Sequence, residues 1–125
     1  MPGMAWQVEF DDEFYREFQD FDAAVQDELL ALTVLLEQFG PALKRPHADT
    51  LKASKHANMR ELRFRAAGGE WRIAYAFDPK RRAILLVGGN KSGGSQQRFY
   101  KTLIRTAGKW FDDHLARLSK GREGD

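Results

Sequence analysis

Apolar and polar residues alternate along residues 60–65 and again along residues 71–77, as they do in β-strands that bury one face. The apolar face is formed by Leu62, Phe64, Trp71, Ile73, Tyr75 and Phe77. The opposite face is formed by Glu61, Arg63, Arg65, Arg72, Ala74 and Ala76. Because the connection between the segments contains two glycines, we expect the segments to pair as an antiparallel hairpin.

A second hairpin is predicted where Asp78 and Pro79 occupy the first two positions of a type I turn. The segment Arg82–Val87 that follows is almost uniformly apolar, so neither of its faces can lie in water. We therefore expect this segment at the centre of the sheet, and the three strands are expected to form an antiparallel meander. On the face that carries the arginines, the two alanines of the preceding strand are expected to leave open space.

The N-terminal third is predicted to be helical after one short strand at residues 5–10. Asp11 or Asp12 can cap a first helix, and Asp22 can start a second one. A glycine–proline pair at residues 40–41 ends the second helix. The apolar stripe of this helix, which we expect to pack on the apolar face of the sheet, comprises Val25, Leu29, Leu32, Leu36 and Phe39.

A long helix is predicted in the last third of the chain, after a polar connection at residues 41–58. The residues at helical spacing are Tyr100, Leu103, Ile104, Ala107, Phe111, Leu115 and Leu118. The predicted order is strand, helix, helix, three antiparallel strands and helix, which is an α+β fold. We expect one domain at residues 1–119 and a polar tail at residues 120–125.

The composition is that of one ordinary globular domain, with 125 residues, 42% hydrophobic and 30% charged. The chain has no cysteine, which excludes disulfides and thiolate chemistry. Residues 1–6 contain neither a basic leader nor an apolar run, and no segment approaches membrane-spanning length, so a cytoplasmic location without a membrane partner is expected. The net charge is +2, but acidic residues crowd the first forty positions and basic residues dominate from residue 44 to residue 109. The second part is therefore expected to meet a polyanion.

The arginines on the polar strand face indicate a site for phosphate. Arg63, Arg65 and Arg72 converge on one predicted surface, and Lys91 follows the apolar strand. Like charges at close range cost stability unless an anion or a carboxylate lies between them. Glu61 alone offsets only part of this repulsion.

Two other chemistries are disfavoured by residue spacing. The histidines are scattered without the spacing of metal ligands, and each is expected to be a surface residue: His47, His56 and His114. The glycine-rich segment at residues 88–94 lacks the Walker spacing and follows an antiparallel strand, so nucleotide hydrolysis is not indicated.

A family resemblance is carried above all by the sequence Trp-Arg-Ile-Ala-Tyr-Ala-Phe-Asp-Pro at residues 71–79. Further matching segments are Leu62–Arg65, Ile84–Leu86, Lys91, Arg98–Tyr100 and Phe111–Leu115. With these segments the chain resembles, over nearly its whole length, the phage-derived Gp49-like, HigB-type toxins of the RelE/ParE superfamily in type II toxin-antitoxin systems. The resemblance implies a RelE/ParE-like fold and a small ribonuclease that cleaves mRNA, typically in the ribosome, without a metal or another cofactor. It also implies a helix-turn-helix antitoxin that silences the toxin in a hetero-oligomer.

The resemblance also assigns roles to individual residues. Arg72 corresponds to a phosphate-binding arginine, Lys91 to a basic residue after the central strand, and Tyr100 to a tyrosine that stacks on a base or helps to move a proton. These three are the candidate catalytic residues, although Tyr100 can equally be a helix residue packed on the sheet. Glu61 stands where RelE-like enzymes often present a lysine, so the general base stays open. The candidate RNA-binding residues are Arg63, Arg65, Lys52, Lys55 and Arg98.

Two alternatives to an mRNA endonuclease share these features. A ParE-like toxin has the same fold but binds and inhibits DNA gyrase without cleaving anything, and such a protein does not need a phosphate site. The other alternative is a basic RNA-binding module without toxicity.

Overall fold

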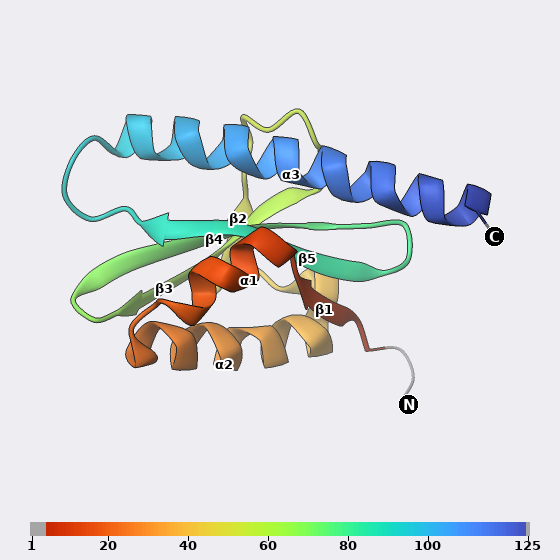
Figure 1. The fold of residues 1–125 in the computed structure, drawn as a ribbon. Helices are drawn as coiled ribbons and strands as arrows, with labels where there is room; N and C mark the ends of the chain where they lie inside the picture. Colours follow the sequence, from red (N-terminus) through yellow and green to blue (C-terminus); the bar gives the residue numbers. More distant parts are fainter. Residues whose placement is uncertain (1–4, 125) are drawn as a thin grey trace.

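The computed structural model describes residues 5–124, so the first four residues of the predicted domain and the last residue of the predicted tail lie outside the described residues. The strands are β1 (Gln7–Phe10), β2 (Ala48–Thr50), β3 (Met59–Ala66), β4 (Gly69–Phe77) and β5 (Arg82–Asn90). The helices are α1 (Asp12–Gln19), α2 (Ala23–Phe39), the short 3₁₀ helix η1 (Gly40–Ala42) and α3 (Gln96–Gly124). The sheet lies between α3 on one face and α1 with α2 on the other (Figure 1), which confirms the predicted α+β fold.

The five strands form one mixed sheet in the order β1-β5-β4-β3-β2. Strands β3, β4 and β5 form the predicted antiparallel meander. At one edge β1 pairs with β5 in parallel, from Gln7 opposite Arg82 to Phe10 opposite Leu85, and at the other edge β2 pairs with β3. Strand β1 was predicted, but its pairing was not, because its partner lies far along the chain. Strand β2 was not predicted, because its three residues are too few to show alternation.

From its composition we expected the apolar strand β5 at the centre of the sheet, and this prediction was wrong. The central strand is β4, and β5 lies between β4 and β1. The run is apolar because both faces of β5 are covered by helices. Ala83 and Leu85 belong to the core under α1 and α2, whereas Ile84 and Leu86 belong to the core under α3.

The second helix packs on the apolar face of the sheet, as predicted. The α2 residues that are buried there are Val25, Leu29, Leu32 and Leu36. Leu32 and Leu36 share one core cluster with Leu62 and Ile73 of the sheet. Phe39 was expected in the same stripe but is 48% exposed. It is the last residue of α2, and Gly40 with a φ of +53° turns the chain away at that point.

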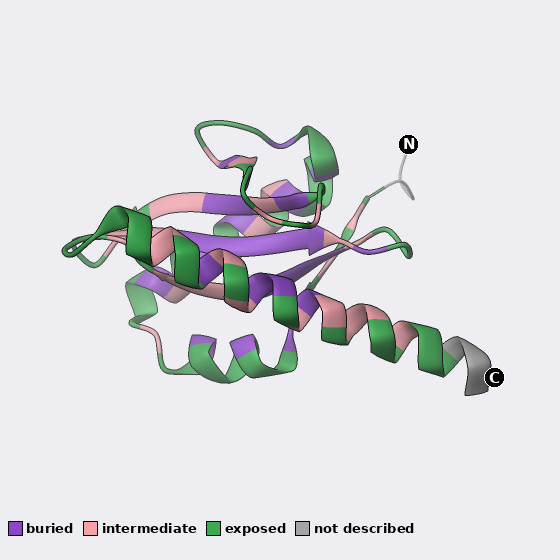
Figure 2. Cartoon of the chain, turned by 90° about the horizontal axis from the view of Figure 1, so that it is seen from above, coloured by how far each residue is buried: buried purple, intermediate pink, exposed green. Residues whose placement is uncertain are grey.

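The face of the sheet that carries Arg72 is covered by α3, so the open space expected beside the alanines is filled. Ala74 and Ala76 form a second core cluster with residues of α3 that include Leu103 and Phe111. The small alanine side chains allow the helix to approach the strands closely. Figure 2 shows buried residues along the strands beside α3 and exposed residues on the outer side of this helix.

Caps and turns mostly follow the predicted chemistry. Asp11 caps α1, and its carboxylate accepts a 3.0 Å hydrogen bond from the Glu13 N–H. The Asp78 carboxylate accepts a 2.9 Å hydrogen bond from the Lys80 N–H in the second turn. After residue 119, where we expected a polar tail, α3 continues to Gly124. No helix within residues 5–124 combines the length and the apolar character required to cross a membrane.

Candidate functional site

A cleft of about 420 Å³ opens between the first turns of α3 and the segment that contains β2, with residues of β3 and β4 on its floor. Most of the predicted site residues line this cleft, namely Arg63, Arg72, Lys52, Lys91 and Tyr100. They come from separate parts of the chain, and the sheet and α3 bring them together. All three candidate catalytic residues therefore share one cleft.

Glu61 lies at the base of the cleft and connects its polar residues. Its Oε2 accepts a 2.7 Å hydrogen bond from Arg63 Nη1, and its Oε1 accepts a 2.9 Å hydrogen bond from the Tyr100 hydroxyl. Arg72 Nε lies 3.9 Å from the same Oε1 atom. The Glu61 side chain is only 4% exposed, so this buried carboxylate partly compensates the charge of the two arginines.

Arg72 is held by neighbouring groups on β4 and α3. Its Nε donates a 3.1 Å hydrogen bond to the Tyr100 hydroxyl, and its Nη1 donates a 2.9 Å hydrogen bond to the Trp71 carbonyl. Its Nη2 lies 3.7 Å from Glu70 Oε1. These contacts fix the plane of the guanidinium, and a fixed set of donors stabilises an anion without first having to reorganise.

The Tyr100 hydroxyl lies between Arg72 and Glu61, so this residue does more than pack on the sheet. Burial raises the pKa of the Tyr100 hydroxyl, and the hydrogen bond to Glu61 raises it further against the opposing influence of Arg72. The hydroxyl therefore keeps its proton at neutral pH and shares it with the Glu61 carboxylate.

Lys91 is placed at the mouth of the cleft by the end of β5. Its backbone N–H donates a 2.8 Å hydrogen bond to the Glu70 carbonyl, just beyond the last residue of β5. Its half-buried side chain lines the cleft with that of Arg72. The predicted basic residue after the apolar strand thus lines the same cleft as Arg72 of the neighbouring strand β4.

Three predicted RNA-binding residues lie outside the cleft. The Arg65 side chain is 82% exposed and lines a neighbouring pocket, 3.9 Å from Glu70. Lys55 Nζ forms a 2.6 Å ion pair with Asp112 of α3. Arg98 lines a different hollow beside the first turn of α3. Their role in RNA binding stays a prediction.

Arg45, Asp49 and Gln96 also line the cleft and were not predicted. The Thr50 N–H and the Arg45 side chain donate hydrogen bonds to Asp49, and these bonds lower the pKa of its carboxyl group. Asp49 reaches the site because β2 places it opposite Glu61. The pairing of β2 with β3 could not be predicted, because the polar connection at residues 41–58 shows no alternation of apolar and polar residues.

Two histidines are not the simple surface residues that the sequence suggested. His114 Nε2 lies 2.9 Å from Asp78 Oδ2, and His56 Nε2 lies 2.9 Å from Asp112 Oδ1. Their side chains are largely buried, and each pair joins α3 to another part of the chain. Neither histidine lines the cleft. Within the described part of the chain, no three side chains of the metal-binding types are grouped so that they could hold a metal ion.

The cleft combines fixed positive charge with a hydroxyl–carboxylate pair. The cations of Arg63, Arg72 and Lys91 line the open cleft, and charge-assisted hydrogen bonds between such groups and a phosphate are strong. Tyr100 and Glu61 are joined by a hydrogen bond along which a proton can move. This arrangement suits a reaction in which negative charge develops on a phosphate while a proton is transferred.

The family model described as phage-derived protein Gp49-like matches residues 16–112. Two proteins of Mycobacterium tuberculosis (strain ATCC 25618 / H37Rv), named as the candidate toxins HigB2 and HigB3, are similar in sequence. The identity with HigB2 is 43% over 98 residues, which cover 78% of this chain and 48% of HigB2. The identity with HigB3 is 46% over 82 residues, which cover 66% of this chain and 69% of HigB3. The chain thus spans about half the length of HigB2.

Two solved structures have a similar fold at low sequence identity. A double arginine-to-alanine mutant of the E. coli toxin RelE in the free state gives a TM-score of 0.60 at 14% identity, covering 81% of this chain and 95% of RelE. A chain of the archaeal RelE–RelB complex from Pyrococcus horikoshii OT3 gives a TM-score of 0.53 at 16% identity, covering 73% of this chain and 100% of that chain. These similarities confirm the predicted RelE-like fold.

Proposed function

Because the chain belongs to the family of phage-derived Gp49-like proteins, we propose that it is the toxin of a type II toxin-antitoxin pair and that it inhibits translation by cleaving mRNA. The observation that carries this proposal is the convergence of Arg63, Arg72, Lys91 and the Tyr100–Glu61 pair in one cleft. A gyrase-binding toxin has no use for such a cleft, and the relatives named HigB support the RNA-directed alternative.

In the proposed reaction the 2′-hydroxyl of a ribose attacks the adjacent phosphorus, the new O–P bond forms and the bond to the 5′-oxygen breaks. Arg72 and Arg63 stabilise the charge that builds up on the phosphorane oxygens. Tyr100 accepts the proton of the 2′-hydroxyl while its own proton passes to Glu61 along their 2.9 Å hydrogen bond. The Lys91 ammonium donates a proton to the departing 5′-oxygen. One proton is thus taken up by Glu61 and one is released by Lys91.

This assignment is tested by Tyr100→Phe, which keeps the ring and removes the hydroxyl. We expect cleavage to fall about a hundredfold, because a positioned proton-transfer group typically contributes that much or more. A tyrosine that only stacks on a base would be replaced by phenylalanine with little loss. The measurement is the single-turnover rate on a ribosome-bound reporter mRNA, with thermal unfolding to verify the fold. A rate equal to that of the wild type would leave Tyr100 with a stacking or packing role.

The proposed partners follow from the same family assignment. The RelE chain from Pyrococcus horikoshii is described in a complex with RelB, which supports an antitoxin partner for this chain as well. We propose a helix-turn-helix antitoxin encoded by the neighbouring reading frame and a toxin–antitoxin hetero-oligomer. We also propose that the mRNA is cleaved while it is bound to the ribosome.

Expression of the chain alone should arrest bacterial growth, because messages cut inside the reading frame cannot be translated to the end. Primer extension on a reporter mRNA should show new 5′ ends within the coding region. Co-expression of the neighbouring frame should restore growth and yield a stable complex.

Two results would contradict this proposal. Intact messages together with trapped gyrase–DNA complexes would favour the ParE-like alternative. Normal growth of unprotected cells that accumulate the folded chain would exclude a toxin of either kind.

A further inference from the structure

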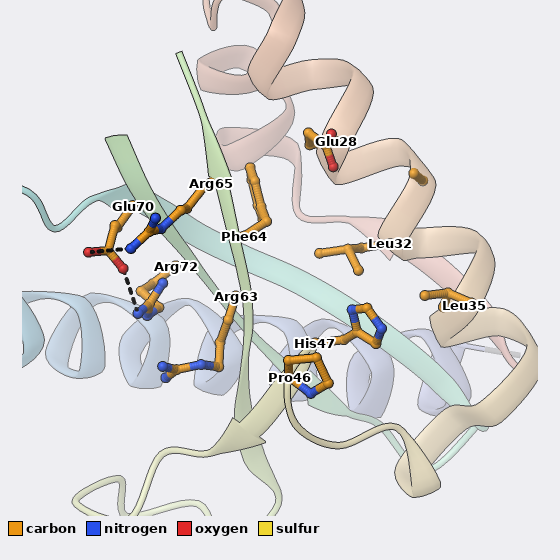
Figure 3. A pocket seen from close by; sticks show the side chains of 11 residues that line it. Glu28, Leu32, Leu35, Pro46, His47, Arg63, Phe64, Arg65, Glu70 and Arg72 are labelled. Carbon is orange, nitrogen blue, oxygen red and sulfur yellow. Dashed lines mark ion pairs between the residues drawn. The ribbon is translucent and has the colours of Figure 1, made fainter. Parts of the chain in front are cut away.

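A second pocket, of about 560 Å³, lies between α2 and the outer part of β3 (Figure 3). It opens beyond the end of β2, which pairs only with residues 60–62 of β3. Arg63 and Arg72 line both this pocket and the cleft described above. The two hollows therefore adjoin at the same two guanidinium groups.

The walls of this pocket are largely apolar, unlike those of the cleft. Figure 3 shows Leu32 and Leu35 on α2 across the pocket from Phe64 and His47, with Pro46 beside the imidazole. Apolar side chains, a phenyl ring and an imidazole next to arginines are the groups on which an unstacked base of single-stranded RNA packs. The volume also lies within the range typical of small-molecule sites, so a base can enter.

We propose that this pocket is a nucleobase subsite, which takes the base of a nucleotide next to the phosphate bound in the cleft. The proposal rests on the proposed RNA-cleaving function. The sugar–phosphate chain crosses Arg63 and Arg72, and the base enters between α2 and Phe64. The Glu28 carboxylate on the α2 wall accepts a hydrogen bond from an exocyclic amino group, so the subsite favours bases that carry one over uracil.

The rim of the pocket matches a nucleotide better than a protein segment. The exposed guanidinium of Arg65 stands at the rim, and Glu70 lies 3.9 Å from it and 3.7 Å from Arg72. A protein segment would have to supply an apolar side chain for the pocket and separate carboxylates for the arginines. Each nucleotide of RNA carries a flat base and an anionic phosphate together, which is the combination that the pocket and its rim require.

The test is a binding experiment that needs no cleavage. Short single-stranded 2′-O-methyl oligoribonucleotides lack the attacking hydroxyl, and one base at a time is removed from them to give a set of abasic probes. With the wild-type chain, one abasic position should weaken binding roughly tenfold or more, since stacking of one base contributes about that much. Ala31→Phe fills the pocket from an exposed position on α2, so it should weaken binding of the intact probe and abolish the difference between intact and abasic probes.

Ala24→Phe is the matched control, because it makes the same change at an exposed position of α2 that does not line the pocket. This variant should keep the wild-type abasic profile. An Ala31→Phe profile equal to that of the wild type, or a wild-type profile without a sensitive position, would overturn the subsite. If Ala31→Phe lost binding to the proposed antitoxin while its RNA binding stayed unchanged, the pocket would instead be a site for a protein partner. A sensitive position in a chain that cleaves no mRNA would uphold the subsite and reject the proposed function.

Discussion

Replacing Arg72 with alanine should lower the rate of RNA cleavage about a hundred- to a thousandfold, or about 2.7–4 kcal/mol of transition-state stabilisation. The Arg72 guanidinium is fixed by Tyr100 and by the Trp71 carbonyl, so in the proposed reaction it would meet the charge of the phosphorane without reorganising. The variant should also lose roughly 1–3 kcal/mol in its free energy of unfolding, because the Arg72 side chain is 5% exposed and its removal leaves buried Glu61 with less compensation. Replacing an arginine on an open strand face would lower only the cleavage rate and not the free energy of unfolding.

The rate and the stability must be measured separately for the Arg72 variants. Arg72→Lys should recover only part of the rate, since an ammonium group cannot reproduce the fork of donors. Arg16→Ala is the control, because the Arg16 side chain is 72% exposed and pairs with Glu13 on α1, away from the cleft. If folded Arg72→Ala protein cleaves at the wild-type rate, Arg72 does not belong to the site.

Replacing Asp78 with alanine should destabilise the fold by about 3–5 kcal/mol, which is the typical cost of removing one partner of a buried ion pair. The Asp78 side chain is fully buried and lies 2.8 Å from Arg82 Nη2. Its carboxylate also lies 2.9 Å from His114 Nε2 and accepts hydrogen bonds from the N–H groups of Lys80 and Arg82. It therefore connects the β4–β5 turn to α3, and its loss should weaken the packing of α3 over the cleft.

Chemical unfolding of Asp78→Ala beside Asp112→Ala checks this expectation. Asp112 also pairs with a histidine, but its side chain is 44% exposed, so Asp112→Ala should lower the free energy of unfolding far less. Equal unfolding curves for the two variants would contradict this role for Asp78.

Burial alone would raise the pKa of Asp78, but hydrogen bonds from His114, Arg82 and the turn outweigh it and hold the pKa below its ordinary value. Asp78 therefore stabilises the fold above about pH 4, the pKa of an unfolded aspartate, and this stabilisation is lost as the pH falls through the lower folded pKa.

The alternation of residues along the strands predicted part of the candidate site. It correctly placed Arg63 and Arg72 on the same face, opposite Leu62 and Ile73. It could not show that α3 covers this face and buries Arg72, because the covering residues lie in a different part of the chain. The family resemblance added Lys91 and Tyr100, and both line the cleft with Arg72.

Local periodicity, turn residues and motifs were sufficient to predict the helices, the antiparallel meander, the face on which the residues of β3 and β4 lie, and the family. No such pattern indicated that β1 and β2 form the edges of the sheet or that α3 lies over the arginines. The three-dimensional structure also shows that Glu61 is shared between Arg63 and Tyr100, because Glu61 and Tyr100 are 39 positions apart and meet only when α3 docks on the sheet. Such contacts follow from packing between distant segments, and no periodic pattern within a segment encodes them.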